Sequence, residues 1–155
     1  MNLKPILQTK LYGLNLIFYE IVNLFNANKL PNKILFSGSK GSGKSTLAYH
    51  FINYIFSINE NHPYNIKLNE ISVQNNSFKL IKNGSHPNFH LIDLIEDKKN
   101  IEISQIRNMI NYANKSSFNN RPRFILIDNV ENLNINSLNA LLKIIEEPNK
   151  NVFFI

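Results

Sequence analysis

Apolar residues recur every three or four positions in the segment 14–28, LNLIFYEIVNLFNAN, which predicts an amphipathic helix. The sequence LPNK that follows contains a proline and ends this pattern. We expect Ser104 to start a helix over residues 104–115 and Pro148 to end one over residues 136–147. Four further helices are predicted over residues 44–57, 69–82, 104–115 and 136–147, and the signal over 69–82 is the weaker one.

Short, nearly continuous apolar runs lie between these segments and predict buried strands. They are ILF at 34–36, FHLIDL at 89–94, RFILID at 123–128, which is the strongest, and VFFI at 152–155. Strands that alternate with helices are typical of a parallel sheet covered by helices on both faces. The pattern therefore predicts an α/β fold, and no shift in composition argues for more than one domain over residues 1–155.

The amino-acid composition limits the kinds of protein to which this chain can belong. The 155 residues are 43% hydrophobic and 18% charged, which is typical of a globular domain with a core. The chain has no cysteine, so disulfides and thiolate metal sites are excluded. The first ten residues lack the long apolar stretch of a signal peptide, and no apolar run reaches membrane-spanning length. We therefore expect a cytoplasmic protein.

The net charge of +6 raises the question of nucleic-acid binding. The basic residues are scattered, however, and only Lys98 with Lys99 and Arg121 with Arg123 form dense pairs. Charge of this kind more often belongs to a solvated surface, so it does not by itself predict a nucleic-acid site.

The segment Gly38–Ser45, GSKGSGKS, fits the phosphate-loop pattern G-x-x-x-x-G-K-[ST] at every fixed position. Glycines allow backbone N–H groups to converge on phosphate groups, and the helix that follows directs its positive end toward them. Lys44 is expected to reach the β and γ phosphates and Ser45 to bind Mg²⁺. The alternative is an ordinary glycine–serine loop with Lys44 in solvent. The expected nucleotide-binding residues are Gly38, Ser39, Lys40, Gly41, Ser42, Gly43, Lys44 and Ser45.

Such a loop needs an acidic residue to complete a magnesium site. Four apolar residues, Phe124 to Ile127, predict a buried strand whose carboxyl end carries Asp128. Ligands of open α/β sheets bind at the carboxyl ends of the strands. We therefore expect Asp128 to hold Mg²⁺ through the nucleotide, and the alternative is an aspartate that caps a turn.

Two longer segments, LPNKILFSGSKGSGKSTLAYHF and FILIDNVENLNINSLNALLKIIEEP, together resemble the clamp-loader subunits of bacterial DNA polymerase III, most closely those of the delta-prime type. SHPNFHLIDL at 85–94 is similar to the His-Pro segment of these subunits, and LYGLN at 11–15 is similar to their box near the adenine. NALLKIIEEP at 139–148 is the most specific element, because generic P-loop enzymes have no reason to carry it.

The resemblance implies an AAA+ nucleotide-binding domain, which is a P-loop NTPase with a three-layer α/β/α fold. It implies ATP and Mg²⁺ as cofactors. It also implies partners: gamma/tau and delta subunits in a hetero-pentamer, the sliding clamp, and primed DNA reached through the assembled complex. The family's sensor residue, arginine finger, lid and collar would lie beyond Ile155, so we expect an N-terminal fragment.

Many bacterial relatives carry a four-cysteine zinc module between the two nucleotide motifs, and this sequence has no cysteine. His86 and His90 are four positions apart, with no further ligand in view. We expect them to be surface or packing histidines, and we expect no zinc.

Asn129 is the second departure from the family. Hydrolysing AAA+ subunits place a glutamate directly after the Asp128 position, and an amide cannot accept a proton as that carboxylate does. General-base catalysis is worth roughly 10²–10⁴-fold in rate. We therefore expect ATP binding with weak or no hydrolysis. Glu131 is the nearest substitute carboxylate, and it either takes a catalytic role or charges the start of the next segment.

Two other functions stay open. An active ATPase of the gamma/tau type would be expected to carry glutamate at position 129. A small-molecule P-loop kinase would need an acceptor-binding charged pair early in the chain and an arginine-rich lid, and neither is visible.

Overall fold

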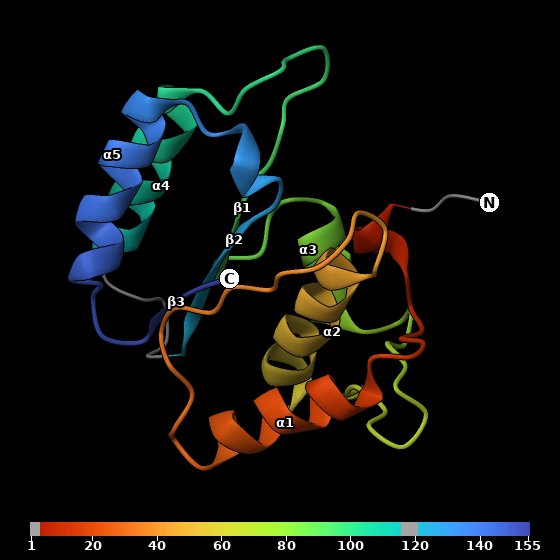
Figure 1. Ribbon diagram of the computed structural model, residues 1–155. Helices are drawn as coiled ribbons and strands as arrows, with labels where there is room; N and C mark the ends of the chain where they lie inside the picture. Colours follow the sequence, from red (N-terminus) through yellow and green to blue (C-terminus); the bar gives the residue numbers. More distant parts are fainter. Residues whose placement is uncertain (1–3, 116–120) are drawn as a thin grey trace. The chain divides into compact units, whose positions relative to one another are not determined.

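The computed structural model describes residues 4–115 and 121–155 (Figure 1). The chain divides into two compact units. The first contains the residues up to Leu30 and Phe36–His86, and the second contains Pro31–Leu35 and Pro87–Ile155. The expectation of one domain over residues 1–155 stays a prediction. Within the described part of the chain, no helix has the length and apolar character needed to cross a lipid bilayer.

The first unit is organised around helix α2, Lys44–Ser57. Ten of its 14 residues are buried, so it is covered on nearly all sides and does not have a single apolar stripe. The short 3-10 helix η1 (Pro5–Leu7), helix α1 (Asn15–Asn26) and helix α3 (Asn76–Lys82) are the other helical elements, and α1, α3 and η1 each contact α2. The positions of α1 and α2 confirm the helices that the apolar spacing predicts.

Helix α3 begins later than the apolar pattern predicts. Asn75 caps it by accepting a hydrogen bond of 2.6 Å from the backbone N–H of Phe78. Upstream of the cap, the backbone groups of Asn69 and Ile71 pair with the segment 9–11. Because these groups already have partners outside a helix, the prediction of a helix from residue 69 is wrong and only its second half forms.

His50 is fully buried on α2 and connects three parts of the first unit. Its Nδ1 lies 2.9 Å from the Tyr64 hydroxyl, and its Nε2 lies 3.2 Å from the carbonyl oxygen of Gln8. A carbonyl only accepts, so Nε2 carries the proton and Nδ1 accepts from Tyr64. Burial lowers the pKa of His50 to about 4, and the hydrogen bond to Gln8 partly opposes this effect.

The second unit contains a parallel sheet with the strand order β1-β2-β3. Its strands are β1 (Phe89–Ile92), β2 (Arg123–Ile127) and β3 (Val152–Phe154). The register aligns Phe89 with Phe124 and Ile92 with Ile127. Helices connect the strands in the order expected for a parallel sheet, which confirms the α/β class. These helices are α4 (Ile103–Asn114) and α5 (Ile135–Glu146), with the 3-10 helix η3 (Val130–Asn132) before α5.

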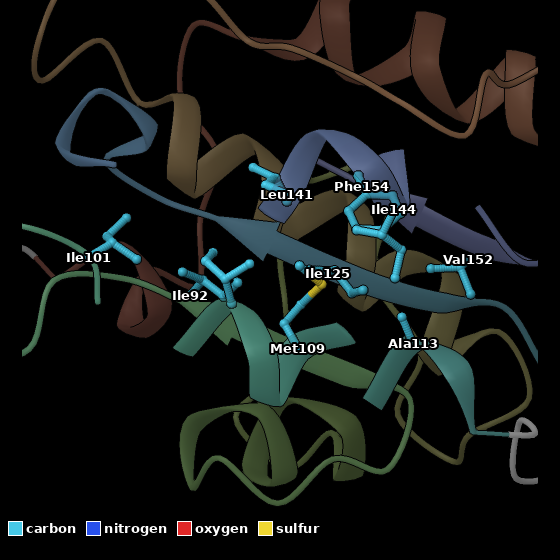
Figure 2. Packing of buried hydrophobic residues seen from close by; sticks show 10 residues of the cluster. Ile92, Ile101, Met109, Ala113, Ile125, Leu141, Ile144, Val152 and Phe154 are labelled. Atoms are coloured by element: carbon cyan, nitrogen blue, oxygen red, sulfur yellow. The ribbon is translucent and has the colours of Figure 1, made fainter. Parts of the chain in front are cut away.

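The core of the second unit lies between the sheet and the helices α4 and α5, which pack against each other (Figure 1). Met109 and Ala113 of α4 and Leu141 and Ile144 of α5 surround Ile125 of the central strand (Figure 2). Ile125 and Met109 have no exposed surface. Burying a side chain of this size stabilises the fold by roughly 1.5–3 kcal/mol, so this cluster holds both helices on the sheet.

The predicted buried strand 34–36 does not form as such. Its start lies beside β3, where the backbone N–H of Ile34 donates to Phe154 at 2.9 Å and the N–H of Phe154 donates to Asn32 at 2.9 Å. The pairing stops after a single bridge at Lys33. Leu35 is 78% exposed, so the prediction of burial is wrong. An apolar run of three residues is too short to separate a strand from the start of a loop.

Helix α4 begins at Ile103 with Glu102 as its N-cap residue, so the prediction that Ser104 starts it is wrong. The backbone N–H of Glu102 donates to Oε1 of Gln105 at 2.9 Å, which is part of a capping box. Lys98 approaches Glu102 to 3.1 Å, and its hydrogen bond lowers the pKa of that carboxyl.

Arg123, a member of one basic pair, is 5% exposed. Its guanidinium donates to the backbone carbonyls of Tyr112, at 2.5 Å, and Lys115 at the end of α4. The last carbonyls of a helix lack partners within it and carry partial negative charge, which stabilises a cation there. Arg123 is therefore a structural residue and is not available to the phosphates of a nucleic acid.

The buried His50 makes the free energy of unfolding depend on pH. Its pKa in the folded chain, about 4, lies below the ordinary histidine value of 6.5, so the unfolded chain binds more protons between these values. The stabilisation is complete above about pH 6.5 and is lost as the pH falls toward 4. We expect wild type to lose up to about 3 kcal/mol relative to a His50→Gln variant over this range.

Urea unfolding at several pH values measures this difference, because the acidic groups common to both proteins cancel. Parallel pH profiles for the two proteins would contradict the prediction.

Candidate phosphate-binding loop and the carboxyl edge of the sheet

The loop Gly38–Ser45 lies directly before and at the start of α2, as the sequence pattern predicts. Gly41 has a φ of 80° and Gly43 a φ of 85°, which are left-handed conformations that favour glycine. The first helical hydrogen bond runs from the N–H of Leu47 to the carbonyl of Gly43 at 2.8 Å. The N–H groups of the helix's first three residues consequently have no partner within the helix and can receive an anion.

Lys44 is the first residue of α2, and its side chain folds back across the loop. Its Nζ donates to the carbonyl oxygens of Gly38 at 3.0 Å and Ser39 at 2.9 Å. The ammonium group thus lies beside the same loop whose N–H groups could bind phosphate. Lys44 therefore contacts the loop while its side chain stays partly exposed, and both interpretations of the loop, a phosphate site or an ordinary glycine–serine loop, stay predictions.

Leu14, in the LYGLN segment, lies against this loop. A Cβ atom added at Gly43 would approach Leu14 Cδ1 to 3.1 Å, whereas one added at Gly41 would meet nothing within 4 Å. Leu14 is half-buried and immediately precedes α1, while Tyr12 is 76% exposed. The segment that the sequence predicts to lie near a nucleotide base is therefore adjacent to the phosphate loop.

Asp128 follows β2 directly at the carboxyl end of the strand, as predicted. Its backbone N–H donates to the carbonyl of Ile92 at 2.9 Å, and its Oδ1 accepts from the N–H of Asn129 at 3.0 Å. Asn129 has a φ of 56°, a left-handed conformation that asparagine tolerates better than most residues. Asp128 and Asn129 thus form a turn with a fixed geometry at the edge of the sheet.

Asp93 is a residue of this edge that the sequence analysis missed. It follows β1, the strand beside β2, and its Oδ1 accepts a hydrogen bond of 2.7 Å from Nδ2 of Asn129. The available signal was the acidic residue near the end of the predicted strand 89–94, because the carboxyl ends of neighbouring parallel strands meet at one edge.

Glu131 lies on η3 and is exposed. The structure gives it no hydrogen-bond partner among the described residues, so its role stays a prediction. The two histidines are packing residues, as expected: His86 stacks on Phe56 at 4.0 Å between ring centroids, and His90 stacks on Tyr112 at 5.0 Å. Burial lowers the pKa of His90. Among residues 4–115 and 121–155, no three His, Cys, Asp or Glu side chains are grouped to hold a metal ion.

The contact between Gly43 and Leu14 gives the two loop glycines different tolerances. Both positions have a positive φ, so alanine at either costs about 1–2 kcal/mol of backbone strain. Only Gly43→Ala also forces Leu14 to move. We expect Gly43→Ala to lower the free energy of unfolding more than Gly41→Ala, as measured by urea denaturation. Equal losses would show that Leu14 does not press on the loop.

Comparison with known proteins shows the family to which the chain belongs. The model of the family described as "DNA polymerase III, delta subunit" matches residues 15–155, which include the loop and the edge residues. The DNA polymerase III subunit delta' of Bacillus subtilis is 27% identical over 84% of this chain and 37% of its own length. The delta' subunit of Buchnera aphidicola subsp. Baizongia pistaciae is 27% identical over 100% of this chain and 44% of its own length.

The DNA polymerase III subunit tau of Bacillus subtilis is 32% identical over 86% of this chain and 22% of its own length. The chain thus spans less than half the length of these relatives. The family model, in contrast, covers nearly all of the chain, and the chain therefore belongs to the DNA polymerase III delta subunit family.

Proposed function

We propose that this chain is the nucleotide-binding part of a clamp-loader subunit of the delta-prime type, and that it binds ATP with Mg²⁺ but hydrolyses it weakly or not at all. The observation that carries the proposal is the loop Gly38–Ser45, with Lys44 Nζ held at its carbonyls and with helical N–H groups that lack partners within the helix. The matched relatives named delta' support the choice of subunit.

Phosphate suits this loop on chemical grounds. A phosphate oxygen is a charged acceptor and therefore a stronger partner for Lys44 than the two carbonyls that the ammonium contacts at 2.9 and 3.0 Å. The loop glycines provide backbone space, because a Cβ at Gly41 would meet no atom within 4 Å. The N–H groups of Lys44, Ser45 and Thr46 would bind the remaining phosphate oxygens.

The proposal assigns Mg²⁺ to the hydroxyl of Ser45 and the carboxylate of Asp128, on the two sequence motifs. Both are oxygen ligands, which Mg²⁺ prefers, and the ion would neutralise charge on the β and γ phosphates. Asp128 Oδ1 accepts one backbone N–H, which would hold the carboxylate in place for this role.

Weak hydrolysis is proposed because the residue after Asp128 is an amide. Asn129 cannot take a proton from water, and its Nδ2 is engaged with Asp93 at 2.7 Å. In the whole subunit, we propose assembly with gamma/tau and delta subunits in a hetero-pentamer that places the sliding clamp on primed DNA in the cytoplasm.

A second candidate is an active ATPase of the gamma/tau type. It is favoured by the relative named tau, whose identity of 32% exceeds the 27% of the two delta' relatives. It requires a carboxylate in place of Asn129, and Glu131 on η3 is the nearest one downstream. Hydrolysis measurements separate the two candidates.

Nucleotide should stabilise the chain through Lys44. ATP with Mg²⁺ at about 100 times its dissociation constant is expected to raise the free energy of unfolding by roughly 2.7 kcal/mol. Lys44→Ala should remove most of this gain, because it deletes the cation at the loop. Thermal unfolding with and without nucleotide measures both effects.

Lys67→Ala is the matched control, since Lys67 is an exposed lysine that lies outside the loop Gly38–Ser45. It should retain most of the shift in melting temperature. A wild-type chain whose melting temperature does not change at saturating nucleotide would refute nucleotide binding.

Hydrolysis by the chain alone should be far below about one turnover per second, a typical lower value for enzymes. The physical reason is the missing carboxylate at Asn129. Release of inorganic phosphate from saturating ATP is the measurement. A rate near one per second that falls in a Glu131→Gln variant would favour the gamma/tau-type candidate over the delta-prime type.

A further inference from the structure

Asp93 and Asn129 are 36 positions apart in sequence and are joined by a side-chain hydrogen bond of 2.7 Å. They follow the neighbouring parallel strands β1 and β2, and the register that aligns Ile92 with Ile127 brings them together. Both side chains are half-buried. This pair is the most direct link between side chains of the two strand ends among the described residues.

The Asp93 side of the pair is held from two directions. Its Oδ1 also accepts the N–H of Leu94 at 2.7 Å, which fixes the carboxylate to its own backbone. Its carbonyl oxygen accepts from Nε2 of Gln105 at 2.8 Å, and Gln105 in turn belongs to the capping box of α4. The start of α4 therefore sets the position of Asp93.

The Asn129 side is fixed as well. Its backbone is left-handed, with a φ of 56° and a ψ of 44°, and its N–H donates to Asp128. An ionised carboxylate has no proton to give, so the amide nitrogen must face Asp93 and the amide oxygen must face away. The orientation of the Asn129 side chain is thus determined by Asp93.

We propose that Asp93 is a positioning residue that locks the amide of Asn129 and makes this edge of the sheet able to bind a nucleotide's magnesium but unable to activate water. The proposal rests on the proposed function. It adds a specific placement of the two groups: the carboxylate of Asp93 follows strand β1, and the amide of Asn129 follows strand β2.

This arrangement predicts that a carboxylate cannot simply be restored at position 129. In an Asn129→Glu variant, the new carboxylate would lie beside Asp93, and two like charges at hydrogen-bonding distance repel each other. The introduced side chain would turn away or take up a proton, and either response removes it as a base. In the double variant, Asp93→Asn replaces the repelling carboxylate with an amide that can donate a hydrogen bond to the carboxylate introduced at position 129. The acid and the amide thereby exchange places between the ends of β1 and β2.

The experiment compares wild type, Asp93→Asn, Asn129→Glu and the double variant. The strain of a left-handed glutamate is present with either residue at position 93, so it cancels in the comparison. We expect Asn129→Glu to melt about 3 °C or more below the double variant. We also expect the double variant to hydrolyse saturating ATP at least about tenfold faster than Asn129→Glu, a conservative fraction of what a general base provides.

Asp97→Asn is the matched control, because Asp97 is an exposed carboxylate in the loop after β1. Combined with Asn129→Glu, it should restore neither stability nor hydrolysis. Equal hydrolysis rates for Asn129→Glu alone and for the double variant would overturn the proposal. Basal hydrolysis that disappears in Asp93→Asn would also overturn it, because Asp93 would then be the base and not a positioning residue.

The nucleotide-dependent rise in melting temperature is measured separately for each variant. If wild type shows no rise, the proposed function fails. The melting temperatures without nucleotide still decide whether Asp93 and Asn129 are coupled, so the two failures can be distinguished.

Discussion

The pairing of β1 with β2 determines which polar groups meet at the carboxyl edge of the sheet. The register aligns Ile92 with Ile127, and the N–H of Asp128 extends this ladder by donating to Ile92 at 2.9 Å. Phe124, Ile125 and Leu126 are buried, so the strand is apolar on both faces, as is typical of parallel sheets. Asp93 and Asp128 directly follow the aligned pair Ile92 and Ile127, and the left-handed turn at Asn129 brings its side chain to Asp93.

The sequence pattern predicts the elements whose signals are long or chemically specific. Helix α2 begins at Lys44 and ends at Ser57, as the apolar spacing indicates, because it is buried on nearly all sides and starts at a fixed glycine loop. Strand β2 and Asp128 were also predictable, since four consecutive apolar residues followed by a single acid have few other interpretations. The position of the phosphate loop and the parallel sheet could therefore be predicted from residue order alone.

The predictions that were wrong concern features determined by residues distant in sequence. Asn75 caps α3 while the backbone before it pairs with the segment 9–11, and neither fact can be recognised from the weak apolar period of 69–82. The burial of Arg123 depends on the carbonyls that end α4, so its charge resembles a surface charge when only the sequence is considered. The bond between Asp93 and Asn129 required the register of two strands, which the sequence does not specify.

The structure explains why asparagine is favoured at position 129, independently of any effect on catalysis. The turn after β2 needs a left-handed residue, and asparagine adopts that conformation with less strain than a β-branched or bulky residue. The same side chain provides the donor that Asp93 requires, whereas a glutamate would bring a second acceptor to an acceptor. Backbone conformation and electrostatics therefore favour the same residue. In the proposed function, Lys44 and Asp128 would bind the nucleotide and its metal, whereas activation of water would depend on position 129, where the amide provides no base.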